Sequence, residues 1–235
     1  MRGRGIFITG TDTGVGKTVV ACALVRALRA QGARVAVMKP VASGAVPTSG
    51  GLRNADALAL MEAAGATVGY AEVNPYCFQP QVSPHIAAKE AGIEVDTGLI
   101  RHAYDALAAN SDWVVVEGAG GWFAPINEHQ TMADLAWSLS VPAVMVVGLK
   151  LGCLNHAQLT RLGVEAQGVS LAGWIANAID PAMRRVAANV RALERLLGEP
   201  ALAVLPHRDD AGAGFALTQV AQRLTARDKL LKRLE

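Results

Sequence analysis

Aromatic residues are scarce in this sequence: they make up 5% of its 235 residues, whereas hydrophobic residues of all kinds make up 51%. An apolar content of this size is enough for one large core. Because Ala, Val, Leu and Gly dominate the sequence, the composition favours helices packed on buried parallel strands over an all-β sandwich. We expect a single α/β domain over residues 1–235.

Cysteine is rare, and neither sign of charge is in large excess. Cys22, Cys77 and Cys153 are odd in number and far apart, so they indicate reduced thiols rather than a disulfide framework or a zinc site. Lys and Arg number 22 against 20 Asp and Glu, which gives a formal net charge of +2. This balance does not indicate a nucleic-acid-binding surface.

The sequence has no segment with the length and composition of a membrane span. The longest uncharged apolar run, 135–149, is too short and is interrupted by Ser138, Ser140 and Pro142. A helix end followed by a buried strand accounts for it. The N-terminal residues also lack the apolar segment and cleavage site of a signal peptide. We therefore expect a cytoplasmic protein without a membrane partner.

Apolar strand-like segments alternate with helical ones along the chain. Strands are expected at 5–10, 33–38, 113–117, 143–148, 171–176 and 201–205. Helices are expected at 17–30, 55–64, 98–110, 131–138, 155–167 and 181–196, with a basic one at 219–235. Short strands that are apolar on both sides and separated by helices predict a doubly wound, mostly parallel sheet with helices on both faces.

The strongest motif is Gly10-Thr-Asp-Thr-Gly-Val-Gly-Lys-Thr18, which lies between the first expected strand and the first expected helix. In this context backbone amides and the helix N-terminus converge on a phosphate, and the last two glycines let the chain wrap closely around it. Lys17 would reach the β- and γ-phosphates, and the Thr18 hydroxyl would bind Mg²⁺. The strict motif has glycine where this chain has Thr11, which leaves an ordinary glycine-rich turn as the alternative.

Polar side chains follow two other expected strands. Glu117 ends one of them at the sheet edge where such folds bind ligands, so it is a candidate Mg²⁺ ligand, with a structural acid as the alternative. Lys39 and Ser43 follow the strand at 33–38, and a lysine there can neutralise charge on a transferring phosphoryl group. Asp56 begins an expected helix, where the helix dipole alone accounts for an acid.

Eight motifs occur together in the chain. In order they are Gly10-Thr-Asp-Thr-Gly-Val-Gly-Lys-Thr18, Lys39-Pro-Val-Ala-Ser-Gly44, Gly51-Leu-Arg-Asn-Ala-Asp56, Val73-Asn-Pro-Tyr76, Ser83-Pro-His85, Val116-Glu-Gly-Ala-Gly-Gly-Trp-Phe123, Lys150-Leu-Gly-Cys-Leu-Asn-His156 and Gly173-Trp-Ile-Ala-Asn177. Over roughly residues 5–210 this set resembles the dethiobiotin synthetases, ATP-dependent P-loop enzymes that close the ureido ring in biotin synthesis. That family's phosphate loop has the glycine spacing found here.

The resemblance implies 7,8-diaminononanoate and CO₂ as substrates, ATP as co-substrate, Mg²⁺ as cofactor and a homodimer. It implies that the reacting groups contact Lys39, Lys17, Thr13 and Ser43, and that the metal is held by Thr18, Asp56 and Glu117. It implies nucleotide contacts from Thr13, Gly14, Val15, Gly16, Lys17, Thr18, Asp56, Glu117, Gly118, Ala119, Gly120, Asn177, Pro206, His207 and Arg208. It implies substrate contacts from Ser43, Gly120, Gly121, Gly152, Cys153, Leu154 and Asn155, the last four at a helix start that receives the substrate carboxylate.

Two other classes share part of the pattern. Switch ATPases of the ParA/MinD type share the Gly-Val-Gly-Lys-Thr core but carry a second lysine at the start of the loop, where this chain has Asp12. Cobyrinic-acid amide synthetases need an ammonia source, usually an added glutaminase domain, which a 235-residue chain used by one domain does not accommodate. Both fit the sequence less well than the dethiobiotin synthetases.

Overall fold

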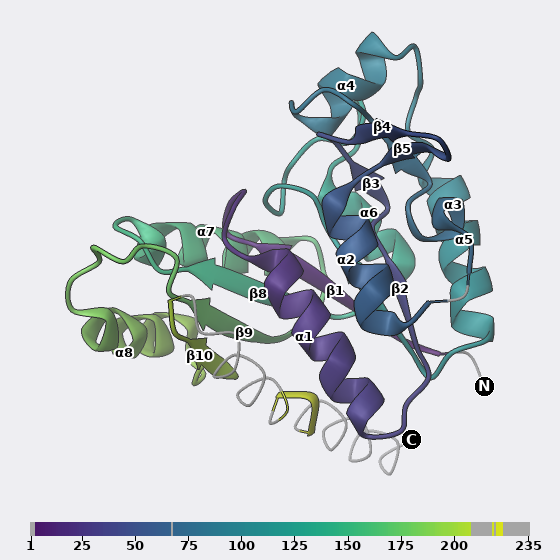
Figure 1. The fold of residues 1–235 in the computed structure, drawn as a ribbon. Helices are drawn as coiled ribbons and strands as arrows, with labels where there is room; N and C mark the ends of the chain where they lie inside the picture. The colour runs from purple at the N-terminus through teal and green to yellow at the C-terminus, as the bar shows by residue number, and fades with distance from the viewer. Residues whose placement is uncertain (1–2, 67, 208–217, 219, 223–235) are drawn as a thin grey trace.

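The core of the protein is a parallel six-stranded sheet (Figure 1). The structure, a computed structural model, describes residues 3–66, 68–207, 218 and 220–222. The strand order is β10-β9-β8-β1-β7-β2, and all neighbouring strands are parallel. The strands are β1 (Arg4–Gly10), β2 (Val35–Met38), β7 (Trp113–Glu117), β8 (Ala143–Gly148), β9 (Leu171–Asn177) and β10 (Ala203–Leu205).

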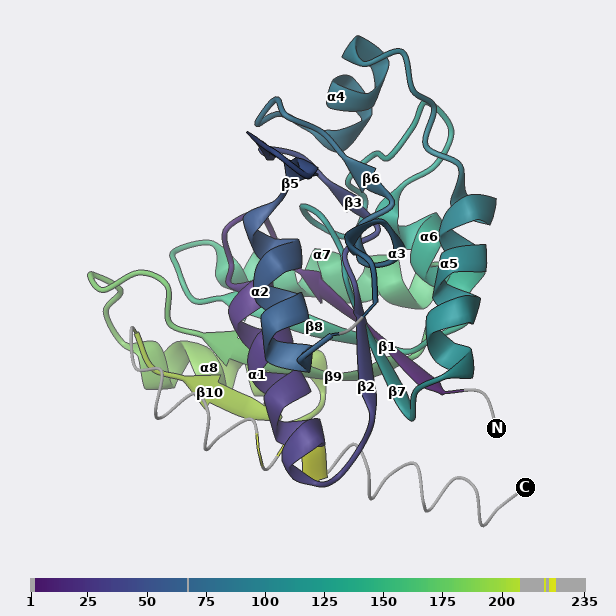
Figure 2. The ribbon, with the colours of Figure 1, turned by 45° about the vertical axis from the view of Figure 1, so that its right-hand side comes forward.

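Helices cover both faces of this sheet (Figures 1 and 2). One face carries α1 (Lys17–Ala30) and α2 (Ala55–Ala64), and the other carries α5 (Thr97–Ala109), α6 (Met132–Leu139), α7 (Cys153–Ala166) and α8 (Val186–Leu197). Strand side chains alternate between the two cores: Ile6 and Ile8 lie with α1, and Phe7 lies with α5 and α6. The predicted doubly wound α/β fold is confirmed.

A group of short elements lies beyond the carboxyl end of β2, at one end of the molecule (Figures 1 and 2). They are β3 (Val41–Ala42), β4 (Val46–Thr48), β5 (Gly51–Arg53), α3 (Tyr70–Val73), β6 (Tyr76–Cys77) and α4 (Pro84–Glu90). β3 pairs with β6, and β4 forms a hairpin with β5. The sequence did not predict these elements, because strands of two or three residues are too short to show an apolar alternation.

Several expected boundaries shift by a few residues. The helix expected at 181–196 begins only at Val186, because Arg185 has φ +60 and a helix cannot continue through that left-handed conformation. The helix expected at 155–167 begins at Cys153, after Gly152 with φ +92. The basic helix expected at 219–235 lies almost entirely outside the described residues. Within the described part, no helix is long and apolar enough to cross a membrane.

Candidate functional site

The phosphate loop connects the carboxyl end of β1 to the start of α1, as the motif predicted. Gly14 and Gly16 have φ +74 and +92, conformations that side chains disfavour. A Cβ on Gly16 would also lie 2.1 Å from Nδ2 of Asn177, so this position has no room for a side chain. No side chain caps the N-terminus of α1, so its first amides are directed at the loop. The loop has the backbone geometry of an anion-binding site.

Lys17, the first residue of α1, folds back over this loop. Its Nζ donates to the carbonyl oxygen of Asp12 at 3.0 Å, and the residue is 7% exposed. Burial and, secondly, the positive charge of Lys39 lower the pKa of Lys17 to about 8. Among the described residues, no carboxylate is bound directly to this buried ammonium, so it is well suited to attract a phosphate.

Lys39 binds two of the three proposed metal ligands, and the third, Thr18, binds one of these two. Its Nζ donates to Glu117 Oε1 at 2.7 Å and to Asp56 Oδ2 at 2.9 Å, and Thr18 Oγ1 donates to the same Glu117 oxygen at 2.8 Å. Asn54 caps α2 by accepting from the Asp56 amide, which fixes Asp56 at the helix start. The sequence had left Asp56 open between a helix acid and a metal ligand, and the structure brings it to the same point as Glu117.

The second oxygen of Glu117 has no hydrogen-bond partner among the described residues, although it is buried. A buried carboxylate oxygen without a partner is costly, and a cation would relieve that cost. The described residues hold no group of three or more His, Cys, Asp or Glu that could bind a metal by itself. Two carboxylates and a threonine hydroxyl beside a phosphate loop are the oxygen donors that suit Mg²⁺ bound together with a phosphate.

Charge is balanced closely in this cluster. Burial, the largest single effect, opposes the charge on Lys39, but Glu117 and Asp56 outweigh it and raise the pKa of Lys39 above its ordinary value. Burial likewise works to raise the pKa of Asp56, but Lys39 and Thr18 outweigh it and lower that pKa. Lys39 and Asp56 are therefore each held in the charged form by the contacts that meet at Lys39 Nζ.

The glycine-rich turn after β7 lies against the phosphate loop. Gly118 donates its amide to Ile8 of β1, and a Cβ on Gly118 would meet the ring of Phe7 at 2.9 Å. A Cβ on Gly121 would lie 3.7 Å from the Gly10 carbonyl oxygen. The turn that carries Gly118, Ala119, Gly120 and Gly121 thus lies beside the phosphate loop.

The described residues that are expected to bind the nucleotide base lie at the ends of two neighbouring strands. Asn177 ends β9, and its Nδ2 donates to the Val15 carbonyl oxygen at 2.9 Å. Pro206 and His207 follow β10, the neighbour of β9, and His207 Nδ1 lies 3.0 Å from the Ala178 carbonyl oxygen. Arg208, the remaining residue of this set, lies outside the described residues.

Ser43 is half-buried and lies near the start of α2, the helix that carries the proposed metal ligand Asp56. Its carbonyl oxygen accepts from Asn54 Nδ2 at 3.1 Å, which ties the loop after β3 to the start of α2. The start of α7 is more exposed: Gly152 and Asn155 face solvent, whereas the Cys153 side chain is 2% exposed. The Cys153 amide already donates to Lys150. Sequence reasoning did not foresee that Cys153 points inward.

Lys150 and Asp12 form an ion pair that no sequence motif indicated. Lys150 follows β8, and its Nζ lies 2.9 Å from Asp12 Oδ2. The other oxygen of this carboxylate accepts from the Thr13 amide at 2.8 Å. The Lys150 hydrogen bond is the largest of the effects that lower the pKa of Asp12. The position of Lys150 after the carboxyl end of a strand, like that of Lys39, was the signal from which a role for this lysine could have been predicted.

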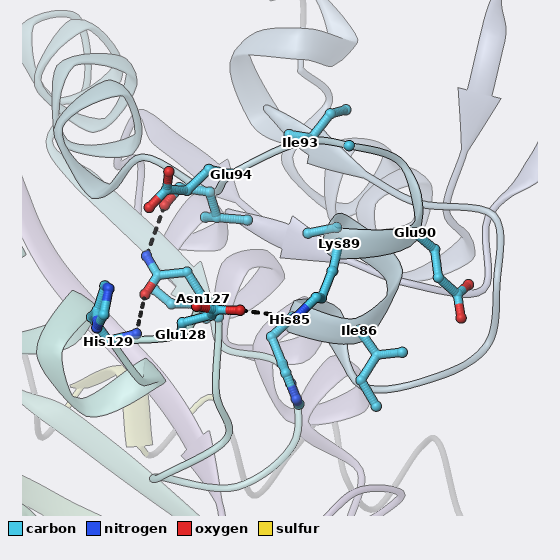
Figure 3. A pocket seen from close by; sticks show the side chains of 13 residues that line it. His85, Ile86, Lys89, Glu90, Ile93, Glu94, Asn127, Glu128 and His129 are labelled. Carbon is cyan, nitrogen blue, oxygen red and sulfur yellow. Dashed lines mark hydrogen bonds and ion pairs between the residues drawn. The ribbon is translucent and has the colours of Figure 1, made fainter.

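A separate hollow of about 800 Å³ lies between α4 and the turn at 126–129 (Figure 3). Lys89 and Glu128 form an ion pair of 3.0 Å beside it, and His85 and His129 are among its lining residues. His85 Nδ1 lies 2.9 Å from the hydroxyl of Ser83, two residues earlier, which is a local structural contact. None of the residues expected at the site lines this hollow.

A family model and solved structures agree on the fold of this chain. A family model described as an AAA domain matches residues 4–213. The MinD protein of Aquifex aeolicus in its complex with MinC superposes with a TM-score of 0.63 and 19% identity over 95% of this chain and 96% of that chain. A MinD from Pyrococcus horikoshii bound to Mg-ADP superposes with a TM-score of 0.57 and 16% identity, over 94% of this chain and 95% of that chain. The fold and the phosphate loop are those of a P-loop nucleotide-binding domain.

Curated relatives are much more similar in sequence. The ATP-dependent dethiobiotin synthetase BioD of Aromatoleum aromaticum is 47% identical over 94% of this chain and 97% of its own length. Its counterpart in Yersinia pestis is 47% identical over 87% of this chain and 85% of its own length. The chain belongs to the dethiobiotin synthetase family, as the motifs indicated.

Proposed function

We propose that this protein catalyses the ATP-dependent closure of a cyclic urea, converting 7,8-diaminononanoate and CO₂ to dethiobiotin with release of ADP and phosphate. The main observation is that the buried Lys39 binds two carboxylates, and that the buried Lys17 lies in the phosphate loop of the same chain, which belongs to this family. Such a site can neutralise the charge of a transferring phosphoryl group and hold a second anion next to it.

The chemistry runs through two activated species. One amine of the substrate takes up CO₂ as a carbamate, and a carbamate oxygen attacks the γ-phosphorus with ADP as the leaving group. The neighbouring amine attacks the carbon of the resulting carbamic–phosphoric anhydride, so that a C–N bond forms and phosphate leaves with the C–O bond broken. Lys17 and Lys39 flank the transferring group, and Thr13 and Ser43 hydrogen-bond the reacting oxygens and nitrogens. Holding both amines next to one carbon is the main entropic contribution to the rate enhancement.

Thr18, Asp56 and Glu117 are the proposed ligands of Mg²⁺. The metal supplies positive charge at the phosphate oxygens when it is bound. The protein side of this site is one hydroxyl and two carboxylates, and the unpartnered Glu117 Oε2 provides a further donor. The amides of residues 13–18 bind the phosphates, and Asn177 with the loop at 206–208 binds the base.

We also propose a homodimer. Asn155, Leu159, Leu162 and Ala166 fall on one exposed face of α7, and Phe123, 57% exposed, lies over Gly163 of the same helix. Exposed apolar side chains gathered on one face are typical of a subunit interface. The amides that follow Cys153 at the start of α7 would receive the substrate carboxylate near this interface.

Residues 1–235 act as one domain, and the free thiols of this domain fit a cytoplasmic location.

The proposal is tested by phosphate release from MgATP, with and without 7,8-diaminononanoate and bicarbonate, combined with mass spectrometry of the product. We expect diamine-dependent release and a product heavier than the diamine by CO₂ less water. ATP hydrolysis that ignores the diamine would contradict the proposal and favour a switch ATPase. Sedimentation of the wild type beside a Leu159→Glu, Leu162→Glu variant tests the dimer, because two buried charges would separate the subunits.

A further inference from the structure

Lys39 already binds both carboxylates of the proposed metal site. Glu117 Oε1 accepts both the Lys39 ammonium at 2.7 Å and the Thr18 hydroxyl at 2.8 Å, and Lys39 also binds the second carboxylate, Asp56. Lys39 and Glu117 are 4% and 1% exposed, so water cannot screen their attraction. A divalent cation that binds these carboxylates, through Glu117 Oε2 or any other of their oxygens, must lie beside the ammonium unless the ammonium moves away.

We propose that Lys39 excludes free divalent cations from this site, so that the metal enters only together with the nucleotide. This inference rests on the proposed metal site. Lys17 and Lys39 already balance the charges of Asp56 and Glu117, so a divalent cation without a nucleotide would leave a net charge of +2 beside the buried Lys39 and Glu117. A nucleotide triphosphate brings the negative charge that makes a metal acceptable beside two lysines.

The geometry lets Lys39 make this exchange with its side chain alone. Its backbone is fixed at both ends: its amide donates to Val73, and its carbonyl oxygen accepts from the buried Asn74 side chain at 2.6 Å. The ammonium can therefore swing without moving the sheet edge. The same group that holds the two carboxylates becomes available to the transferring phosphoryl group only after metal and nucleotide arrive. Lys39 would thus couple metal entry to its own placement in the reaction.

The experiment measures Mn²⁺ binding to the nucleotide-free protein by the electron paramagnetic resonance signal of free Mn²⁺. We expect Lys39→Met to bind Mn²⁺ at least tenfold more tightly than the wild type. Lys17→Met is the matched control: it removes one buried positive charge from the same cavity but leaves the bond to Glu117, so its gain should stay below about threefold. Adding Glu117→Gln to Lys39→Met should abolish the gain.

Equal Mn²⁺ affinity in Lys39→Met and wild type, or an equal gain in Lys17→Met, would overturn the inference. Lys39→Gln provides a second variant should Lys39→Met not fold, and thermal melting identifies such a case. The proposed metal site is tested separately, by the Mn²⁺-dependent binding of a non-hydrolysable ATP analogue to Glu117→Gln. If Glu117→Gln binds as the wild type does, the metal site itself is wrong. If only Lys39→Met fails to respond, the site stands and the exclusion is wrong.

Discussion

Two lysines at the same edge of the sheet form ion pairs of very different character. Lys39 follows β2, has a side chain that is 5% exposed and binds the buried Glu117 as well as the more exposed Asp56, whereas Lys150 follows β8 and pairs with Asp12 while their side chains are 36% and 44% exposed. Both N–O distances are close to 2.9 Å for the pairs with Asp56 and Asp12. Geometry alone therefore does not distinguish them.

Burial does distinguish them. Removing one partner of a buried pair leaves an uncompensated charge, which costs about 3–5 kcal/mol, whereas an exposed pair contributes about 0–1 kcal/mol. The Lys39 cluster is also the point where the proposed chemistry occurs, while the Lys150 pair braces the first half of the phosphate loop through Asp12 and Thr13. We expect Lys39 to be indispensable for activity and Lys150 to tolerate substitution.

Replacing Lys39 by Ala should give the largest effect. We expect kcat to fall by about a thousandfold, because a preorganised charge at the phosphoryl group is lost, while binding of an ATP analogue stays within a few-fold. Steady-state phosphate release and calorimetric titration of the analogue measure the two quantities. Near-normal turnover in Lys39→Ala would refute the role assigned to this ammonium.

Exchanging lysine for arginine at both positions sharpens the contrast. At Lys39 the larger planar guanidinium meets a closed cavity, so we expect at least a hundredfold loss of kcat/KM. At Lys150 the exposed side chain can rearrange and still reach Asp12, so kcat/KM should remain within about threefold. The same assay applied to both variants checks this. Equal losses would mean that burial is not what separates the two sites.

Lys17 lies between these extremes, since it is buried but has no carboxylate bound to its Nζ. Its pKa of about 8 means that the free protein loses this charge as the pH rises above 8. A bound triphosphate favours the ammonium, so binding at higher pH must take up a proton. We expect the affinity for an ATP analogue to fall about tenfold from pH 7.5 to 9.5, and Lys17→Arg to flatten that dependence. Calorimetry in two buffers of different ionisation enthalpy also measures the proton uptake.

Much of this architecture was predictable from the sequence. The six strands are continuous apolar segments that alternate with helical ones, and the phosphate loop has a fixed relation to β1 and α1. The bounds of β7, β8, α1 and α2 match the expected ones. The short elements at the carboxyl edge were missed because their side chains are exposed or too few to form a pattern; all three residues of β4 are exposed.

The site was harder to predict where it depends on pairing between distant segments. The sequence alone could not decide whether Asp56 served the dipole of α2 or a metal, since that depends on Glu117, in another strand, and on Lys39 between them. The Lys150 pair with Asp12 spans 138 positions and was missed for the same reason. The family resemblance implied roles for single residues, but only the fold shows that Lys39 and Thr18 donate to the same oxygen of Glu117.

The smallest effect should come from Lys150→Met. We expect the affinity for an ATP analogue to weaken by two- to fivefold with kcat nearly unchanged, because the loop loses one brace but keeps its glycines and Lys17. Asp12→Asn should weaken binding similarly, and the double variant no further, with a coupling of about 0.5–1 kcal/mol. Titrations at low and high ionic strength test the exposed character of the pair, since salt should reduce the coupling. A loss of kcat beyond a hundredfold in Lys150→Met would place this lysine with Lys39 in the chemistry, and the distinction by burial would have to be abandoned.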